Sequence, residues 1–469
     1  MIIWIRKVYL DHNATTPIHP DVAKFIARNM RKISGNPSSL HTVGRHAKYL
    51  IEEAREKIAS ALECNSAKVF FTSGGTEGNN TVIKGVFAKH DYKGTLITSA
   101  MEHESILGAA RQLEERGVKI IRLTDVSQVE KVLSDDTRLV SIMHANNETG
   151  IINDIENIGR LCKARGILFH ADAVQSFGKI PVFPEKIGCD FLTISSHKIN
   201  GPKGCGALYI RDYRLLGALI YGGDQEHALR AGTENVHSIA GFGEAARLRM
   251  ENINKDYEYL QAWRQKFLSG LREIYPEVKV NEAALQLPGT MSLTFPGESN
   301  LKLLAALDCY GVEVSNGSAC TADRIVPSHV LLGMGYDEQY ALSTIRVSVS
   351  ASNSMADLRY VLKVFREIRT QKLDNFAYLM PEHLTPERQK SAYLIDIRWP
   401  FERMQRQSLP QAHEVNVLRF ESWSKSIPRE REIIIMCTTG VMSGLNGYKL
   451  ARKGFDVKVL YGGYAALPF

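Results

Sequence analysis

The sequence predicts an α/β protein whose main domain is a largely parallel sheet covered by helices on both faces. Short apolar runs at residues 68–72, 95–98, 139–144, 167–171 and 191–195 alternate with segments long enough to form helices. Such alternation indicates repeated β-α-β units, which place helices on both faces of a sheet. The 469 residues exceed one typical core and suggest about three domains of roughly 150 residues each.

The spacing of apolar residues places the remaining elements. The short apolar stretch at the N-terminus lacks a basic start and a cleavage site, so we expect a strand there and not a signal peptide. Between residues 38 and 62, helical spacing predicts a helix before the sheet. A long helical stretch after residue 241 leads to a smaller unit with apolar runs at 289–295, 311–315 and 344–349.

The C-terminal part shows its own short βαβ pattern, with runs at 393–397, 433–437 and 457–461 and a helix over 442–453. A polar stretch with Pro381 and Pro386 precedes it and is typical of a linker. We therefore expect five parts, namely an N-terminal segment that joins the small domain (1–15), a large domain (16–255), a small domain (256–372), a linker (373–390) and a C-terminal domain (391–469).

Composition excludes several classes of protein. The hydrophobic fraction of 44% and the charged fraction of 23% are ordinary for a globular protein, and no apolar run is long enough to span a bilayer. The net charge of +7 is spread along the chain, which favours an ordinary surface over an acidic or RNA partner and indicates no direct nucleic-acid binding. The seven scattered cysteines form neither a C-x-x-C pair nor a zinc pattern, so we expect no metal site, and reduced thiols in the cytoplasm.

Polar side chains follow five of the expected strands. Because ligands bind at the carboxyl ends of parallel strands, these residues predict a pocket. They are Ser73-Gly74-Gly75-Thr76-Glu77, Glu102-His103-Glu104, Asn146-Asn147-Glu148, Asp172-Ala173-Val174-Gln175 and Ser196-His197-Lys198.

Two charged residues of this pocket indicate its chemistry. Asp172 could be a simple helix cap, but it could also pair with a pyridinium nitrogen. Lys198 follows about one strand later, and a lysine at a buried strand end needs a partner or a function. The glycine turn at Gly75 and Thr76 lets backbone N–H groups approach an anion. With Ser195 and His197 nearby, the pattern fits pyridoxal phosphate bound to Lys198.

Residues 8 to about 370 resemble the cysteine desulfurases, pyridoxal-phosphate enzymes of fold type I in the class V aminotransferase group. The resemblance implies a large sheet domain, a smaller α+β domain and L-cysteine as substrate. The matching stretches are residues 9–17, 35–39, 72–80, 146–150, 170–175, 195–206, 230–235 and 317–320.

The resemblance also implies roles for individual residues. Lys198 would form the Schiff base and move the Cα proton, while His103 would stack on the ring as acid or base. Asp172 would pair with the ring nitrogen and Gln175 with the ring hydroxyl. Asn147 and Arg346 would orient the substrate. The residues implied around the phosphate are Gly75, Thr76, Ser195, His197 and Thr233. Thr233 would come from the other subunit of a homodimer.

Cys320 would take the sulfur in this scheme, leaving a persulfide and releasing alanine. Its flanking residues Ser318-Ala319-Cys320-Thr321 resemble the branch of the family with a long cysteine loop, which can reach the thiol of an acceptor protein. A thiolate on such a loop is also the acceptor that the chemistry requires.

Residues 391–469 resemble a rhodanese domain, through 394–398, 461–464 and the loop 437–443. Cys437 would lie in a cradle of backbone N–H groups and receive sulfur from Cys320. Met442 stands where this loop usually has an arginine, so transfer from thiosulfate is expected to be poor. A domain that only docks partners is the alternative.

Two other readings of the whole chain stay open at this level. Another class V reaction, such as transamination or selenocysteine cleavage, would proceed without Cys320. A non-enzymatic platform for sulfur-trafficking partners would not need Lys198 or Asp172, and both are present. The final acceptor is also open among iron–sulfur scaffolds, tRNA thiolation and molybdenum-cofactor synthesis.

Overall fold

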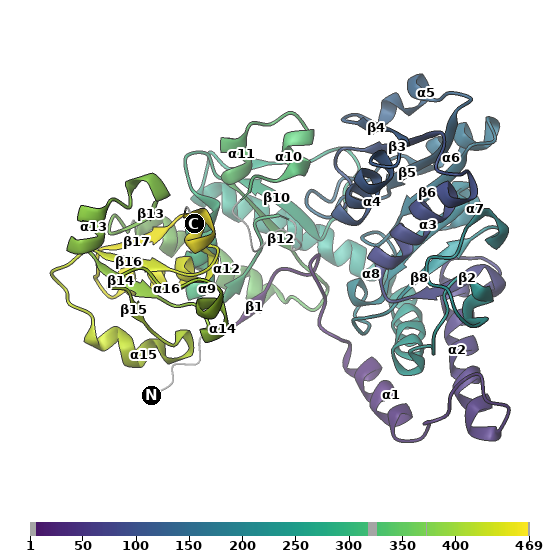
Figure 1. Cartoon of the computed structure of the whole chain (residues 1–469), viewed down its shortest axis with the longest axis horizontal. Coiled ribbons are helices and arrows are strands. Elements are labelled where there is room, and N and C mark those ends of the chain that lie inside the picture. The colour runs from purple at the N-terminus through teal and green to yellow at the C-terminus, as the bar shows by residue number, and fades with distance from the viewer. Residues whose placement is uncertain (1–5, 318–325, 372, 468–469) are drawn as a thin grey trace.

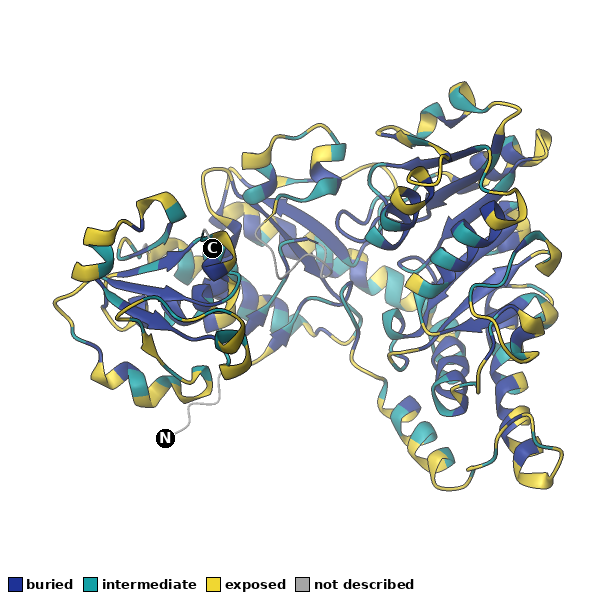
Figure 2. Cartoon of the chain, in the orientation of Figure 1, coloured by how far each residue is buried: buried dark blue, intermediate teal, exposed yellow. Residues whose placement is uncertain are grey.

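The computed structural model describes residues 6–317, 326–371 and 373–467. Figure 1 shows three consecutive units, with the large domain at one end, the small domain in the middle and the C-terminal domain at the other end. In Figure 2 the strands are mostly buried, whereas the surrounding helices are buried on one side only. None of the helices in these ranges is long and apolar enough to cross a membrane.

The large domain contains a seven-stranded sheet in the order β2-β8-β7-β6-β5-β3-β4. All pairs are parallel except those of β8, which runs antiparallel to both of its neighbours. The five expected strands are present, and β4 and β8 were not foreseen. The strands are β2 (Val69–Thr72), β3 (Thr95–Ser99), β4 (Lys119–Leu123), β5 (Thr137–Met143), β6 (Leu168–Asp172), β7 (Phe191–Ser195) and β8 (Gly206–Ile210).

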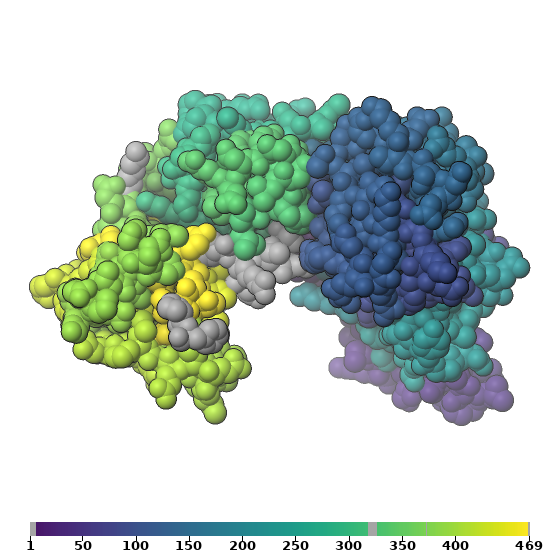
Figure 3. Space-filling model, turned by 45° about the horizontal axis from the view of Figure 1, so that its top comes forward, coloured from purple at the N-terminus to yellow at the C-terminus, as the bar shows by residue number. Residues whose placement is uncertain are grey.

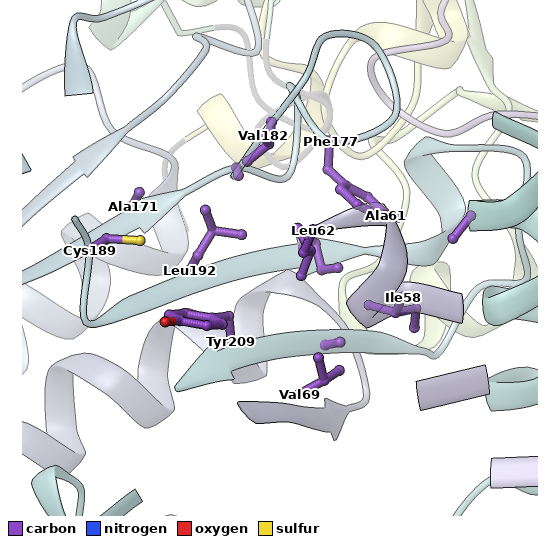
Figure 4. Packing of buried hydrophobic residues seen from close by; sticks show 14 of the residues in the cluster. Ile58, Ala61, Leu62, Val69, Ala171, Phe177, Val182, Cys189, Leu192 and Tyr209 are labelled. Carbon is purple, nitrogen blue, oxygen red and sulfur yellow. The ribbon is translucent and has the colours of Figure 1, made fainter. Parts of the chain in front are cut away.

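Helices cover both faces of this sheet, as the βαβ pattern predicted. Side chains of a strand alternate between the faces, so Leu139 and Phe191 pack against one helical layer while Val140 and Leu192 pack against the other. Figure 4 shows the second layer, where Leu192 and Tyr209 lie near Leu62. The helices are α1 (Pro20–Met30), α2 (Thr42–Ala61), α3 (Gly75–Lys89), α4 (Glu104–Glu114), α5 (Val129–Val132), α6 (Ile155–Ala164), α7 (Pro184–Ile187) and α8 (Val236–Ile274).

Helix α8 belongs to two domains. Its first turns contribute Phe242 and Ala245 to the core of the large domain, and its last turns contribute Trp263 and Phe267 to the core of the small domain. The expected boundary at residue 255 therefore falls inside a continuous helix.

The small domain contains an antiparallel sheet in the order β12-β10-β9. The N-terminal strand β1 pairs with β11, and Asp11 bridges to Ser348, so the chain start is built into this domain. The elements are β1 (Val8–Tyr9), β9 (Lys279–Val280), β10 (Thr290–Thr294), α9 (Asn300–Cys309), β11 (Val312–Glu313), α10 (His329–Gly333), α11 (Glu338–Leu342), β12 (Thr344–Ser348) and α12 (Met355–Thr370).

The C-terminal domain is a parallel five-stranded sheet in the order β13-β17-β16-β14-β15. Its helix α16 packs on the neighbouring helix α9 of the small domain. The elements are β13 (Phe376–Leu379), α13 (Pro386–Ser391), β14 (Tyr393–Asp396), α14 (Pro400–Gln405), β15 (His413–Glu414), α15 (Phe420–Trp423), β16 (Ile433–Met436), α16 (Val441–Arg452) and β17 (Val457–Leu460).

The expected linker over 373–390 is corrected by the structure. Strand β13 forms the edge of the C-terminal sheet, and Phe376 is buried in its core. Just before it, the Asn375 side chain donates hydrogen bonds of 2.8 Å to the carbonyl oxygens of Ala451 and Phe455. The polar composition concealed a short strand whose backbone is paired and whose apolar side chains are partly covered.

The C-terminal domain is attached by a packed interface. Ala305, Ala306 and Cys309 on one side of α9 share an apolar cluster with Tyr448 and Leu450 of α16. Leu303 and Leu307 of α9 pack in the core of the small domain. In Figure 3 the three units form an arch, with a hollow between the C-terminal and large domains.

Candidate active site

A cavity of about 180 Å³ lies at the carboxyl ends of the large-domain strands, against the small domain. Among the described residues, it brings together every one expected at the cofactor and substrate except Thr233. The expected residues that line it are Gly75, Thr76, His103, Asn147, Asp172, Gln175, Ser195, His197, Lys198 and Arg346.

One end of the cavity has the features of an anion site. Helix α3 begins at Gly75, so its first backbone N–H groups and the positive end of its dipole face this end. A side chain at position 75 would collide with Val174, which explains the glycine. The hydroxyl of Ser195 is buried and has no hydrogen-bond partner among the described residues. A phosphate oxygen would satisfy it.

His197 lies beside this end, and its Nδ1 is 3.1 Å from the hydroxyl of Thr15. Burial, followed by the nearby Lys198 and Lys203, lowers the pKa of His197 to about 4. The ring is therefore neutral at pH 7 and contributes a hydrogen bond, not a charge.

Asp172 is held at the floor of the cavity by two donors. Its Oδ2 accepts a hydrogen bond of 2.7 Å from Asn79, and its Oδ1 accepts one of 2.9 Å from the N–H of Val174. Asn79 also donates to the hydroxyl of Ser105, which lies 2.8 Å from Nδ1 of His103. A chain of hydrogen bonds thus fixes the carboxylate and the imidazole relative to each other.

The tautomer of His103 follows from the same contacts. The backbone N–H of Ser105 donates to Nδ1 of His103 at 3.1 Å, so this nitrogen is an acceptor. A neutral imidazole then carries its proton on Nε2. Since His103 lines the cavity, a proton on Nε2 suits this ring for contacts with a bound ring or for proton transfer.

The amine of Lys198 is held by the N-terminal segment. Its Nζ donates to the carbonyl oxygens of Asn13 at 2.5 Å and Ala14 at 2.9 Å. The segment is fixed in turn because Thr16 donates to the carbonyl of His197 at 2.9 Å. Asn13 and Lys198 are 185 residues apart in the chain, and they therefore meet only in the folded protein.

Arg346 closes the opposite side of the cavity from strand β12. It is only 2% exposed, and its Nη2 forms an ion pair of 2.6 Å with Asp11. Its Nη1 donates to the carbonyl of Asn147 at 3.1 Å, while its Nε has no hydrogen-bond partner among the described residues. A guanidinium fixed in this way can present its remaining donors to a carboxylate.

Two of the expected residues that the structure describes, Thr233 and Cys437, do not line the cavity. Thr233 lies in an exposed turn before α8, and Cys437 lies in the C-terminal domain. Cys320 falls outside the described residues. The chain that leads to it is described as far as Gly317, and nearby Ser315 exchanges backbone hydrogen bonds with Arg346. The segment that carries Cys320 therefore starts beside a residue of the cavity.

Cys437 lies at the carboxyl end of β16, just before α16. Its Sγ accepts hydrogen bonds from the N–H groups of Gly440 at 3.1 Å and Ser443 at 3.4 Å. Gly440 has a φ of 88°, a left-handed conformation that suits glycine and turns its N–H toward the sulfur. The side chain of Met442 is 37% exposed beside this loop.

Sequence reasoning missed three residues that support the cavity, namely Asn13, Asn79 and Lys179. The first two line it, and Lys179 binds Asn13 and Gln175 from behind. Asn13 and Asn79 lie in the stretches 9–17 and 72–80 that carry the family resemblance, which was the available signal. No cluster of metal-binding side chains occurs in the described ranges.

Residues 8–361 match the family Aminotransferase class-V, and residues 381–467 match the Rhodanese-like domain. A protein of Dictyoglomus turgidum named cysteine desulfurase IscS is 42% identical over 372 residues, which cover 77% of this chain and 94% of that protein. The cysteine desulfurase IscS of Methanosarcina thermophila is 38% identical, covering 80% and 95%.

Solved structures agree with these sequence relatives. The structure of a NifS-like protein shares 35% identity and a TM-score of 0.73, covering 78% of this chain and 100% of that one. The NifS-like protein from Rickettsia africae shares 38% identity and a TM-score of 0.70, with coverage of 78% and 100%. The chain belongs to the class V aminotransferase family, among the relatives of the cysteine desulfurases, and carries a rhodanese-like domain in addition.

Proposed function

We propose that the chain is a pyridoxal-phosphate-dependent cysteine desulfurase that passes sulfur from Cys320 to Cys437. The observation that carries this proposal is the single cavity in which Lys198, Asp172 and Arg346 converge. That cavity lies in a chain 42% identical to a protein named as a cysteine desulfurase.

The residues of the cavity fit the cofactor. The phosphate would bind at the start of α3, where the buried hydroxyl of Ser195 has no other partner. Asp172 would pair with the ring nitrogen, and Gln175 would donate to the ring hydroxyl. When bound, pyridoxal phosphate supplies an electron sink that permits loss of the Cα proton and of sulfur.

Lys198 and His103 are the groups that would move protons. The carbonyls of Asn13 and Ala14 orient the Lys198 amine toward the cavity. His103 offers an N–H on Nε2, fixed by the contacts of Ser105 with Nδ1. Lys198 would move the Cα proton of the substrate, and His103 would assist as acid or base.

Arg346 would bind the carboxylate of L-cysteine. Its side chain is already desolvated and held by Asp11, so substrate binding costs little further ordering. Asn147 lines the same side of the cavity and would help to orient the substrate. A planar guanidinium gives the bidentate contact that selects an α-carboxylate.

The Cys320 thiolate would attack the sulfur of the substrate. An S–S bond forms and the Cβ–S bond of the substrate breaks, and its electron pair stays on carbon, which is protonated to give alanine. The products are alanine and a Cys320 persulfide. The position of Ser315 beside Arg346 supports this step, because it starts the segment next to the cavity.

Transfer to Cys437 is a thiol–persulfide exchange. The Cys437 thiolate attacks the outer sulfur of the Cys320 persulfide, which restores the Cys320 thiol and leaves a persulfide on Cys437. The N–H groups of Gly440 and Ser443 would stabilise the negative sulfur. The loaded Cys437 would then supply an acceptor protein for iron–sulfur cluster assembly, tRNA thiolation or cofactor thiolation.

A homodimer would complete the phosphate site. Thr233 does not line the cavity of its own chain and lies in an exposed turn, so a second copy could insert it. We further propose that the enzyme acts in the cytoplasm, where reduced thiols persist.

The desulfurase activity is tested by mixing the enzyme with L-cysteine and a thiol reductant. Alanine and sulfide should appear in equal amounts, and Cys320→Ser should abolish both while the absorbance of the bound cofactor is retained. Full activity of Cys320→Ser would contradict the proposed mechanism and favour another class V reaction.

The transfer step is tested with cysteine that carries radiolabelled sulfur. Label should reach Cys437 in the parent enzyme and should be absent from Cys437 in Cys320→Ser. A Cys437→Ser variant serves as the matched control, because it should still produce alanine and still carry label on Cys320. Label on Cys437 without Cys320 would refute the relay.

A further inference from the structure

Lys179 approaches the cofactor cavity from behind, on the segment that follows β6. Its Nζ donates hydrogen bonds to the side-chain oxygens of Gln175 at 2.9 Å and Asn13 at 3.0 Å. Lys179 and Lys198 also line one small cavity of about 30 Å³, a volume that holds about one water molecule. The lysine is thus part of the same hydrogen-bonded group as the reactive amine.

The contact with Lys179 fixes the direction of the Gln175 amide. Because Oε1 of Gln175 accepts from Lys179, its NH₂ group points toward Asn13, whose carbonyl it binds at 3.0 Å. The opposite orientation would place Oε1 against the carbonyl oxygen of Asn13, which is also an acceptor. Lys179 therefore keeps an N–H of Gln175, a residue of the cavity lining, as the donor.

Lys179 also binds the residue whose main-chain carbonyl holds the reactive lysine. The carbonyl of Asn13 accepts from both Lys198 and Gln175, and Lys179 binds the side chain of that asparagine. Removing the amine of Lys179 would take one hydrogen bond from Gln175 and one from Asn13, whose side chain keeps its bonds to Asn147 and Thr290.

No carboxylate lies within ion-pair distance of Lys179 in the described part of the chain. Burial and the positive charges of Lys198, Arg249 and Arg346 lower its pKa well below the usual value. The titratable and charged groups around it are His12 and Lys198, the α8 residues Arg249, Asp256 and Tyr257, and Arg346 of β12.

We propose that Lys179 is a positioning residue that aims the Gln175 amide at the ring hydroxyl and the Asn13 carbonyl at Lys198. This inference rests on the proposed function, since it assumes that pyridoxal phosphate binds at Lys198. A hydrogen bond donated to the ring oxygen makes the nitrogen that links Lys198 to the cofactor easier to deprotonate. Loss of Lys179 should weaken that hydrogen bond and so make the same nitrogen harder to deprotonate.

The test is a pH titration of the absorbance of the bound cofactor in Lys179→Met, which keeps the length of the side chain and removes its donors. The midpoint should rise by about one pH unit, as expected for loss of one hydrogen bond to a charged group. Lys186→Met, at an exposed lysine paired with Glu156, is the matched control and should leave the midpoint unchanged.

A double-mutant cycle distinguishes positioning from a general loss of structure. Gln175→Ala alone should raise the midpoint by a similar amount, and adding Lys179→Met should then change it little. Equal shifts from Lys179→Met in both backgrounds, or no shift in either single variant, would overturn the proposal. If Lys179→Met does not fold, an unchanged midpoint in Gln175→Ala still overturns the proposal, and Lys179→Gln, which keeps a donor, replaces Lys179→Met in the cycle.

Failure of this inference differs from failure of the proposed function. If the parent protein binds pyridoxal phosphate and the titration midpoint does not depend on Lys179, only the role of Lys179 is refuted. If the parent protein does not bind the cofactor, the proposed function and the inference fail together.

Discussion

The hydroxyl of Ser195 tests the phosphate site, because this residue is 1% exposed and its hydroxyl has no hydrogen-bond partner among the described residues. Replacing Ser195 with alanine removes a donor that only a ligand would use. A hydrogen bond to a charged group contributes about 1.5–3 kcal/mol, which corresponds to a loss of roughly ten- to hundred-fold in affinity for pyridoxal phosphate. The apoprotein loses no internal hydrogen bond, so its free energy of unfolding should change by less than about 0.5 kcal/mol.

Thr193 supplies the matched control for Ser195. It lies two residues earlier on β7, faces the same side of the sheet, and its hydroxyl is 2.9 Å from Nε2 of the buried His170. Thr193→Val should therefore show the opposite pattern, with an apoprotein less stable by about 1–3 kcal/mol and little change in cofactor affinity.

The assay has two measurements on each variant. Cofactor affinity is obtained by titrating the apoprotein with pyridoxal phosphate and following absorbance, and stability is obtained by urea unfolding of the apoprotein. A Ser195→Ala protein with unchanged affinity and lowered stability would refute the placement of the phosphate at the start of α3.

Three further predictions follow from contacts of other residues. Arg346→Lys keeps a positive charge beside Asp11 but loses the planar donors. The kcat/KM for cysteine should therefore fall about ten- to hundred-fold in assays of alanine production. An unchanged kcat/KM would exclude Arg346 from substrate binding. Asp396→Ala would leave Arg398, whose side chain is only 2% exposed, without its carboxylate partner. The rhodanese-like domain should lose about 3–5 kcal/mol of stability, measured by calorimetry. Glu430→Ala, at an exposed position, is the control and should have little effect. Burial lowers the pKa of His170 to about 3, below its value in the unfolded chain, so its contribution to stability is complete above about pH 6.5 and is lost as the pH falls toward 3. The urea midpoint should fall less steeply with acidity in His170→Gln than in the parent protein, and parallel curves would contradict this assignment.

Much of the fold could be predicted because its strands are buried on both faces. The strands β5 and β7 are mostly apolar and almost wholly buried, as strands between two helical layers must be. Strand β4 was missed because it is an edge strand with exposed Lys119 and Arg122, which gives no such run. Strand β13 was missed for a similar reason, since its partly exposed residues lie among polar neighbours.

The candidate site was predicted where it follows strands and missed where it depends on contacts distant in sequence. Asp172 is the last residue of β6 and Lys198 lies in the short turn after β7, positions that predict ligand binding. In contrast, the role of Asn13 depends on a separation of 185 residues from Lys198, which no local pattern encodes. Lys179 looks like a surface lysine in the sequence, and only its inward contacts with two amide oxygens distinguish it.

Helix α9 decides how this protein can be divided for experiments. Because Ala305, Ala306 and Cys309 are covered by the C-terminal domain, a truncation after residue 371 would expose an apolar stripe on the catalytic part. Such a fragment would be prone to self-association for reasons unrelated to sulfur transfer. Charged substitutions at Ala305 and Ala306 should accompany any such truncation, and the isolated rhodanese-like domain needs the same treatment on the facing side of α16.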